Sequence, residues 1–381
     1  MEQPAGNKIT GNPSSHPALS VKWVEDFPDI PLNRNEAYKL RVTSKGVEIE
    51  AITETGVYRA IQTLRQLTEK KGNGIAITGC EITDWPAFRI RGFMQDVGRT
   101  YISTDELKRE IAILARYKIN VFHWHLTENQ AWRLQSKVFP MLNDSVNTTR
   151  QPGKYYTLEE ARELAAFCKQ HHVLLIPEID MPGHSAAFVR TFRHDMQSPE
   201  GMKILKLLID EVCETFDVPY LHIGTDEVQF TNPDFVPEMV AYVRSKGKKV
   251  ISWNPGWHYK PGEIDMTHLW SYRGKAQKGI PAIDSRFHYL NHFDTFANGF
   301  LGIHFHCHPH ESELRCFVQL VCIAILDRVL ACDVLDLEMT VVKVDRVVDD
   351  CFQLSVFSIS VLQVLHEAQI AQLGLQLLDG W

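Results

Sequence analysis

The chain has 381 residues, of which 44% are hydrophobic and 23% charged, so it can bury a sizeable core and is neither disordered nor collagen-like. Lys and Arg number 40 against 47 Asp and Glu, and this net charge of -7 argues against a nucleic-acid-binding surface. The longest apolar runs, such as residues 317–326, are shorter than the ~20 residues that span a bilayer, so we expect no membrane association. The first thirty residues contain no apolar leader segment, which leaves a cytoplasmic protein or one whose leader has been removed for periplasmic or secreted use.

Residues 38–77 predict a small α/β unit. Residues 38–44 and 46–53 alternate apolar and polar side chains, as half-buried strands do, and residues 53–70 carry apolar side chains at helical spacing before a further strand. Pro86 then interrupts regular structure. We therefore expect residues 1–86 to form a small α/β accessory domain.

After Pro86, apolar strand-like runs alternate with amphipathic helices, a pattern typical of a parallel sheet covered by helices. Ser103 and Glu106 form a capping box ahead of the first of these helices. Polar residues gather at the carboxyl end of every run, which favours a (β/α)₈ barrel over an open sheet. We expect residues 87–297 to contain barrel strands one to seven. The seven runs are residues 90–99, 119–129, 172–184, 219–228, 249–257, 265–274 and 280–291.

Residues 298–381 differ from the rest of the chain in composition. They contain 4 basic and 11 acidic residues and five of the eight cysteines, whereas the first 297 residues contain 36 basic and 36 acidic residues. No eighth barrel strand can be recognised among them. We hypothesise that this tail is an out-of-frame or otherwise aberrant reading of the gene, poorly ordered, and that the barrel is incomplete with unpaired edges at strands one and seven.

The pair Asp226–Glu227 carries the strongest chemical signal. It follows the strand-like run of residues 219–225, where a barrel strand would open into the catalytic face. Trp253 and Trp270 end the next two runs, and indole rings suit the apolar faces of sugars. Glycoside cleavage usually needs two carboxylates, but the seventh run offers no Glu, so a mechanism in which the substrate supplies its own nucleophile is attractive.

These residues lead to a family resemblance. The segment HIGTDEV at residues 222–228 resembles the H-x-G-G-D-E signature of glycoside hydrolase family 20, the β-N-acetylhexosaminidases. The likeness covers about residues 35–297 and continues through FRIRGFMQDVGR, NVFHWHLTENQAWR, PEIDMPGH, ISWNPGW, HLWSY and HYLNHFDTF. It implies an exo-acting enzyme that releases terminal N-acetylglucosamine or N-acetylgalactosamine from glycans by a retaining, substrate-assisted mechanism, without a cofactor or metal.

The resemblance also implies roles for individual residues. Glu227 would protonate the leaving oxygen and then activate water, and Asp226 would hold the 2-acetamido group whose oxygen attacks the anomeric carbon. Tyr289 would donate a hydrogen bond to that oxygen, and Arg91 would bind the sugar's C3 and C4 hydroxyls.

Further positions are expected to bind the substrate or support the reacting centre. His184 follows the third strand, and Glu128 stands where many relatives have Asp. Thr225 replaces the second glycine of the signature, which tightens the turn before the acidic pair. Trp253 and Trp270 are also expected to bind the substrate, because they end the fifth and sixth strands.

Two other functions remain open. A metal-dependent barrel hydrolase could use His123 and His125, which share one side of a strand, together with Asp180 and His184. The sequence contains no CxxC pair to suggest a zinc knuckle. An inactive sugar-binding remnant with a disrupted barrel is the non-enzymatic alternative. The oligomeric state, the linkage and the gluco or galacto preference are not fixed by the sequence.

Overall fold

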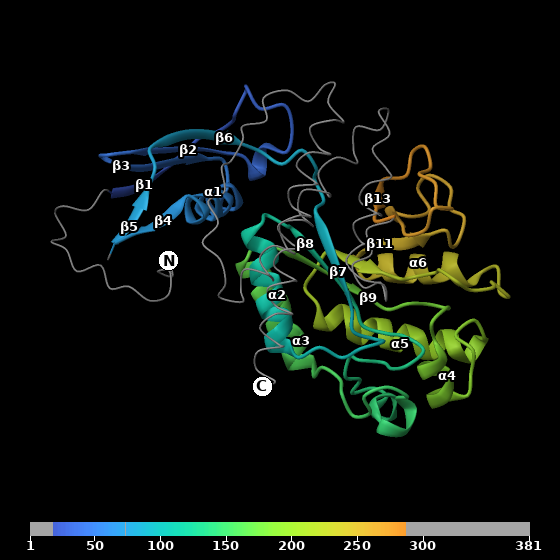
Figure 1. The fold of residues 1–381 in the computed structure, drawn as a ribbon. Helices are drawn as coiled ribbons and strands as arrows, with labels where there is room; N and C mark the ends of the chain where they lie inside the picture. The colour runs from blue at the N-terminus through green and yellow to red at the C-terminus, as the bar shows by residue number, and fades with distance from the viewer. Residues whose placement is uncertain (1–17, 73, 287–381) are drawn as a thin grey trace, which may run out of the picture. The chain divides into compact units, whose positions relative to one another are not determined.

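The computed structural model describes residues 18–72 and 74–286, which form two larger sheets, one hairpin and the helices between their strands (Figure 1). The expectations for Tyr289 and for the tail at residues 298–381 fall outside the described residues.

The first sheet has four strands and is covered by one helix. In spatial order it contains β1 (Ala18–Trp23), β3 (Gly46–Ala51), β2 (Tyr38–Thr43) and β6 (Cys80–Asp84). Helix α1 (Glu54–Gln66) begins at Thr53, whose hydroxyl accepts the backbone N–H of Gly56, and packs on Tyr38, Leu40 and Ile49. A short 3₁₀ helix, η2 (Arg34–Glu36), precedes β2.

The α1 helix is shorter than the helical pattern of residues 53–70 predicts. It ends at Gln66, and the chain continues into a hairpin of β4 (Thr68–Lys71) and β5 (Gly74–Ile77). The Thr68 hydroxyl donates to the carbonyl of Leu64 at 2.9 Å, which satisfies an acceptor that the helix end leaves open.

The second sheet has seven parallel strands in sequence order, as the alternating pattern predicts (Figure 1). Its order is β7 (Gly92–Asp96), β8 (Val121–His125), β9 (Leu174–Glu178), β10 (Tyr220–His222), β11 (Lys249–Asn254), β12 (Met266–Leu269) and β13 (Ala282–Asp284). Each strand pairs with the next, and β7 and β13 are the ends of the sheet within residues 74–286. The prediction of a parallel barrel-type sheet after a small α/β unit is confirmed, whereas the expected lack of an eighth strand falls outside the described residues.

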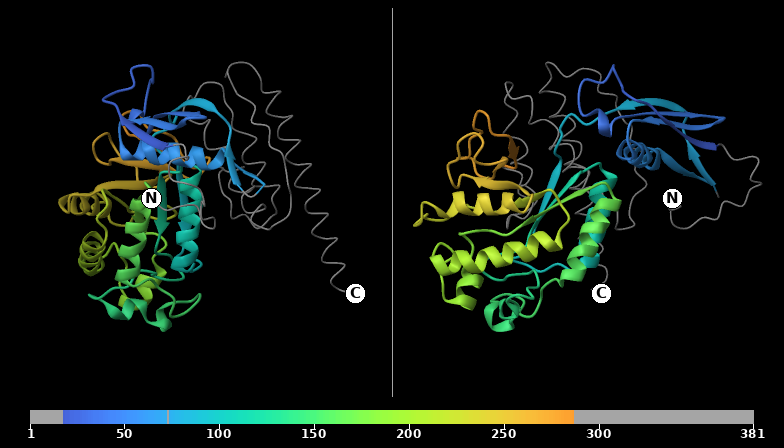
Figure 2. Two further views of the ribbon diagram at one scale, coloured as in Figure 1. Left: turned by 90° about the vertical axis from the view of Figure 1, so that its left-hand side faces the viewer. Right: turned by 180° about the vertical axis from the view of Figure 1, so that it is seen from behind.

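Helices α2, α3, α5 and α6 lie on one face of this sheet (Figures 1 and 2). The predicted capping box at Ser103 and Glu106 is confirmed, and Thr157 and Glu160 form a second one at the next helix. No helix in the part of the chain that the structure describes is long and apolar enough to cross a membrane. The helices are α2 (Thr104–Arg116), α3 (Leu158–Gln170), α4 (Ala186–Phe192), α5 (Pro199–Thr215) and α6 (Phe235–Ser245), with 3₁₀ turns η3 (Pro140–Asn143) and η4 (Ser145–Asn147).

Strand β8 shows how the sheet separates an apolar face from a polar interior. Phe122 and Trp124 are fully buried in the main hydrophobic core, and burial of each large side chain contributes roughly 1.5–3 kcal/mol. His123 and His125 point to the opposite face, because successive strand residues alternate, and they are also buried. Both faces of the strand are therefore buried, one against apolar side chains and the other against polar ones. The polar groups that follow the strands therefore meet at the carboxyl edge.

Candidate active site

The turn after β10 places the predicted acidic pair. The strand ends at His222, and the backbone then has positive φ at Gly224 (68°), Thr225 (85°) and Glu227 (48°). Non-glycine residues in such conformations cost about 1–3 kcal/mol each and persist only where the surroundings hold them. Because the extended strand has ended, Asp226 and Glu227 are free of the alternation that would point them to opposite faces.

Close packing holds this turn in place. A Cβ on Gly224 would lie 1.7 Å from the Asp180 carboxylate, and one on Gly183 would lie 2.5 Å from the carbonyl oxygen of Asp226. Only glycine fits at these two positions, because the neighbouring groups are buried or belong to the backbone. The segment that follows β9 therefore packs closely against the turn that follows β10 and holds it in place.

Thr225, which replaces a glycine of the signature, is tied into the protein by its hydroxyl. Its Oγ1 lies 2.6 Å from the Oγ of Ser252, and the Tyr259 hydroxyl donates to that same Oγ at 2.9 Å. The backbone N–H of Trp253 also donates to the carbonyl of Gly224 at 2.8 Å. These contacts stabilise a left-handed threonine that would otherwise be strained.

His184 brings three predicted residues together. Its Nδ1 contacts Glu128 Oε1, and its Nε2 lies 3.6 Å from Asp226 Oδ2 and 3.4 Å from Glu227 Oε2. Burial would lower the pKa of the His184 imidazole, but hydrogen bonds to Asp226 and Glu128 outweigh it and raise the pKa to about 11. His184 is therefore a cation at neutral pH, held among carboxylates. The longer Glu at position 128 still reaches it.

The two members of the acidic pair differ in exposure. The Asp226 side chain is 14% exposed, whereas that of Glu227 is 55% exposed. Asp226 is thus suited to hold a buried part of a ligand, and Glu227 is open to an incoming group.

Arg99 belongs to this site, although the sequence analysis did not select it. It follows β7, and its guanidinium binds Glu128 Oε1 at 2.5 Å and Asp96 Oδ2 at 2.5 Å. Burial opposes the charge, but Asp96, Glu128 and Asp226 together raise the pKa of Arg99. Its side chain is 43% exposed, so the guanidinium can also meet a ligand. The signal available in the sequence was its position just beyond the carboxyl end of a barrel strand.

The structure does not bring Arg91 to the site, and this corrects the expectation that it binds sugar hydroxyls. Arg91 precedes β7, so it lies at the amino edge of the parallel sheet, opposite the acidic pair. Its guanidinium donates to Glu36 Oε2 at 2.5 Å, to the Phe88 carbonyl at 2.7 Å and to the Lys118 carbonyl at 2.8 Å. The Arg91 side chain is 7% exposed, and its contacts stabilise the fold by joining β7 to Glu36 and to the segment before β8.

The two tryptophans of the expected sugar pocket lie differently. The Trp253 ring is buried, donates through Nε1 to Glu178 Oε1 at 2.7 Å, and packs on His268 with ring centroids 4.2 Å apart. Trp270 is half-buried, and its Nε1 donates to the carbonyl of Pro255 at 2.8 Å.

Two buried carboxyl groups lie beneath the site: Asp180, which was predicted only as a ligand in the metal-hydrolase hypothesis, and Glu178, which was not predicted. Asp180 Oδ1 accepts the backbone N–H of Thr225 at 3.3 Å; burial and the carboxylates of Asp226 and Glu178 raise the pKa of Asp180 well above its ordinary value. Burial would also raise the pKa of Glu178, but the imidazoles of His125, His222 and His123 hold it well below its ordinary value. Glu178 could not be selected from the sequence, because its neighbours come from separate strands.

Among residues 18–72 and 74–286, three groups of side chains are close enough to share a metal ion. The four residues of the metal-hydrolase hypothesis do not form one of them: His125 groups with Glu178 and Asp180, and His184 groups with Asp180 and Asp226. The remaining group is His123, His222 and His268.

The structure thus places an acidic pair, contacted by His184, at the carboxyl edge of a parallel barrel sheet, which is the edge where barrel enzymes carry their active sites. Residues 88–198 match the family model described as glycosyl hydrolase family 20, catalytic domain, and residues 5–85 match glycosyl hydrolase family 20, domain 2. The chain belongs to glycosyl hydrolase family 20.

Named relatives agree with this assignment. The chain is 36% identical over 260 residues to a beta-hexosaminidase of Porphyromonas gingivalis, covering 59% of this chain and 32% of the relative. It is 31% identical to a beta-N-acetylhexosaminidase of Cellulomonas fimi, covering 62% of this chain and 53% of the relative. The chain thus spans about a third to a half of the length of such curated relatives.

Solved structures show the same fold. The beta-N-acetylhexosaminidase of Bacteroides fragilis matches with a TM-score of 0.59 at 28% identity, covering 67% of this chain and 59% of that one. A mutant beta-hexosaminidase of Streptomyces plicatus in complex with the product GlcNAc matches with a TM-score of 0.61 at 27% identity, covering 70% of this chain and 62% of that one.

Proposed function

We propose that this protein is an exo-acting β-N-acetylhexosaminidase that releases terminal N-acetylglucosamine or N-acetylgalactosamine from glycans. The observation that carries the proposal is the contact of one histidine, His184, with Glu128, Asp226 and Glu227 at the carboxyl edge of the barrel sheet. Family membership and the names of the relatives support the same activity.

The reaction we propose is retaining and substrate-assisted. Glu227 protonates the glycosidic oxygen, because its side chain is 55% exposed and therefore open to an incoming group. The carbonyl oxygen of the substrate's 2-acetamido group attacks the anomeric carbon as the glycosidic bond breaks, which gives an oxazolinium ion. Glu227 then removes a proton from water, and the water opens this ion with net retention.

Asp226 orients the acetamido group and stabilises the positive charge that develops on its nitrogen. The less exposed position of this carboxylate suits contact with a substituent rather than with the leaving group. His184 and Glu128 hold the acidic pair in position. His184 Nε2 contacts both acidic side chains, and Glu128 contacts His184 Nδ1. A fixed constellation of this kind lowers the entropic part of the barrier.

The remaining binding roles are also proposals. We assign the C3 and C4 hydroxyls to Arg99, which has the exposure and position that Arg91 lacks. Trp270 offers a half-buried ring for stacking on the sugar face. Trp253 closes the floor of the site, and Tyr289 remains the expected donor to the acetamide oxygen.

Hydrolysis of an aryl N-acetyl-β-glucosaminide by the purified chain tests the proposal. Glu227→Gln should lose far more rate on substrates with poor leaving groups than on activated aryl substrates, because protonation matters most when the leaving group is basic. Asp226→Asn should lose rate on both. Glu214→Gln and Asp217→Asn, which change exposed residues of the same types, serve as matched controls.

Three outcomes distinguish the alternatives. Turnover with the expected leaving-group dependence supports the proposal. Calorimetric binding of N-acetylglucosamine without turnover supports a sugar-binding remnant instead. Activity that a chelator abolishes and zinc restores supports a metal-dependent hydrolase.

A further inference from the structure

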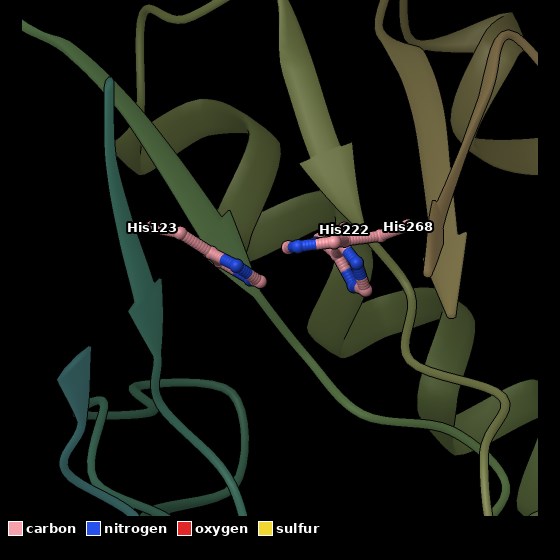
Figure 3. Close-up of side chains that lie close together, drawn as sticks. All are labelled: His123, His222 and His268. Atoms are coloured by element: carbon pink, nitrogen blue, oxygen red, sulfur yellow. The ribbon is translucent and has the colours of Figure 1, made fainter. Parts of the chain in front are cut away.

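Three histidines from alternate strands meet inside the seven-stranded sheet. His123 lies on β8, His222 on β10 and His268 on β12, and one ring nitrogen of each lies within 4.8 Å of the others (Figure 3). All three residues are at most 5% exposed. Side chains from alternate strands form one layer in a barrel interior, which explains how residues so distant in sequence converge.

A carboxylate stands behind two of these rings. Glu178 Oε2 lies 2.7 Å from His123 Nε2, and Glu178 Oε1 lies 3.2 Å from His222 Nδ1. The backbone N–H of Gly224 donates to His222 Nδ1 at 3.1 Å. Binding of an ion through Nε2 would move the ring proton to Nδ1, which would then donate to Glu178 in place of accepting from Gly224. When both rings donate to Glu178, His123 Nδ1 and His222 Nε2 are left as free lone pairs. Metal-binding histidines are usually oriented by a carboxylate in this way.

Buried nitrogens in this layer lack hydrogen-bond partners. Neither His222 Nε2 nor His268 Nδ1 has one among residues 18–72 and 74–286. Orphaned buried polar atoms are rare in folded proteins and call for an explanation.

The spacing of the rings fits a common central ion. Their centroids are 4.5 Å apart for His123 and His222, and 5.6 Å apart for each of these with His268. With a Zn–N bond of about 2.0–2.1 Å, three imidazoles around a tetrahedral ion have centroids roughly 5 Å apart. We propose that His123, His222 and His268 form a binding site for a divalent transition metal, with Zn²⁺ as the best-fitting ion.

The chemistry of the donors narrows the class of metal. Three neutral imidazoles favour Zn²⁺, Co²⁺, Ni²⁺ or Cu²⁺ over Mg²⁺ and Ca²⁺, which prefer oxygen ligands. A bound ion would connect β8, β10 and β12, which are not hydrogen-bonded to one another. It would therefore stabilise the folded sheet. This site is separate from the His184 group that carries the proposed hydrolysis.

Metal titration of the full chain tests this inference. After removal of bound metal by a chelator, we expect one equivalent of Co²⁺ to bind with the visible absorption of tetrahedral coordination, and Zn²⁺ to displace it. Zn²⁺ should also raise the melting temperature. His268→Gln should abolish the absorption, whereas His194→Gln, which changes an exposed histidine, should leave it unchanged.

Two results would overturn the inference: the wild-type chain takes up no Co²⁺ or Zn²⁺ at micromolar concentration, or the folded His268→Gln protein gives the wild-type spectrum. If His268→Gln does not fold, X-ray absorption at the zinc edge of the wild-type protein decides. Three imidazole nitrogens at about 2.0–2.1 Å support the site, and any other ligand set refutes it.

Discussion

Arg91 and Arg99 are eight positions apart, and mutation can separate their roles. Arg91 stabilises the fold, whereas we assign Arg99 to substrate binding. Arg91→Met should destabilise the fold, because it leaves Glu36, which is 16% exposed, without one of its cationic partners and removes the donor to two carbonyls. Breaking such a buried pair costs about 3–5 kcal/mol. At about 2–4 °C per kcal/mol for a domain of this size, the melting temperature should fall by roughly 10 °C.

Arg99→Met should instead impair substrate binding and turnover. Charge-assisted hydrogen bonds to sugar hydroxyls are worth about 1.5–3 kcal/mol, which corresponds to a loss of roughly 10- to 150-fold in kcat/KM. Arg99→Met should lower the melting temperature as well, because it leaves Glu128, which is 1% exposed, with His184 as its other cationic contact. The two variants are therefore separated by their activity per folded molecule.

Thermal unfolding followed by circular dichroism and steady-state hydrolysis of an aryl N-acetyl-β-glucosaminide measure the two effects on the same preparations. Activity is expressed per folded molecule, at a temperature well below both unfolding transitions. The reasoning is refuted if Arg91→Met melts like the wild type but loses kcat/KM, while Arg99→Met keeps full activity.

The remaining predictions concern the groups around the catalytic turn. The pKa of His184 is raised in the folded protein to about 11 from 6.5, so its charge stabilises the fold fully below pH 6.5, and this contribution is lost as pH rises through 11. The difference in urea midpoint between wild type and His184→Gln should therefore shrink toward pH 11; a constant difference contradicts the assignment. Gly224→Ala should reduce kcat by at least ~100-fold, because its Cβ would lie 1.7 Å from the Asp180 carboxylate, and wild-type kinetics would show that the turn is not tightly held. Glu178→Leu should lower the free energy of unfolding by about 3–5 kcal/mol in urea titrations, since it orphans the buried donor of Trp253 and the facing imidazoles.

The sequence predicts the barrel sheet well, because its strands are buried on both faces and end in polar groups. The edge strand β1 was not predicted, since Leu19, Val21 and Trp23 are exposed there and give no pattern of one buried face. The pairing of β1 with β3 is a tertiary contact that local periodicity does not contain.

The sequence predicts the location of the acidic pair, because the pair follows a strand. It does not predict the direction in which individual side chains point. The prediction for Arg91 was wrong because Arg91 precedes strand β7 and therefore lies at the amino edge of the sheet. Arg99 follows the same strand and lies at the carboxyl edge, where the acidic pair is. Trp253 was expected at the mouth, whereas its ring packs on His222 and His268 in the interior. The interactions of Glu178 with Trp253, His123 and His222 could not be predicted from the neighbouring sequence, since these partners come from other strands.

The rate ratio between an aryl N-acetyl-β-glucosaminide and the matching aryl β-glucoside is the most direct test of the proposed reaction. If the acetamido group is the nucleophile that Asp226 orients, the glucoside should be nearly inert, and Asp226→Asn should lower only the rate of the N-acetylated substrate. Comparable rates for the two substrates in the wild-type protein would contradict substrate assistance and remove the role assigned to Asp226.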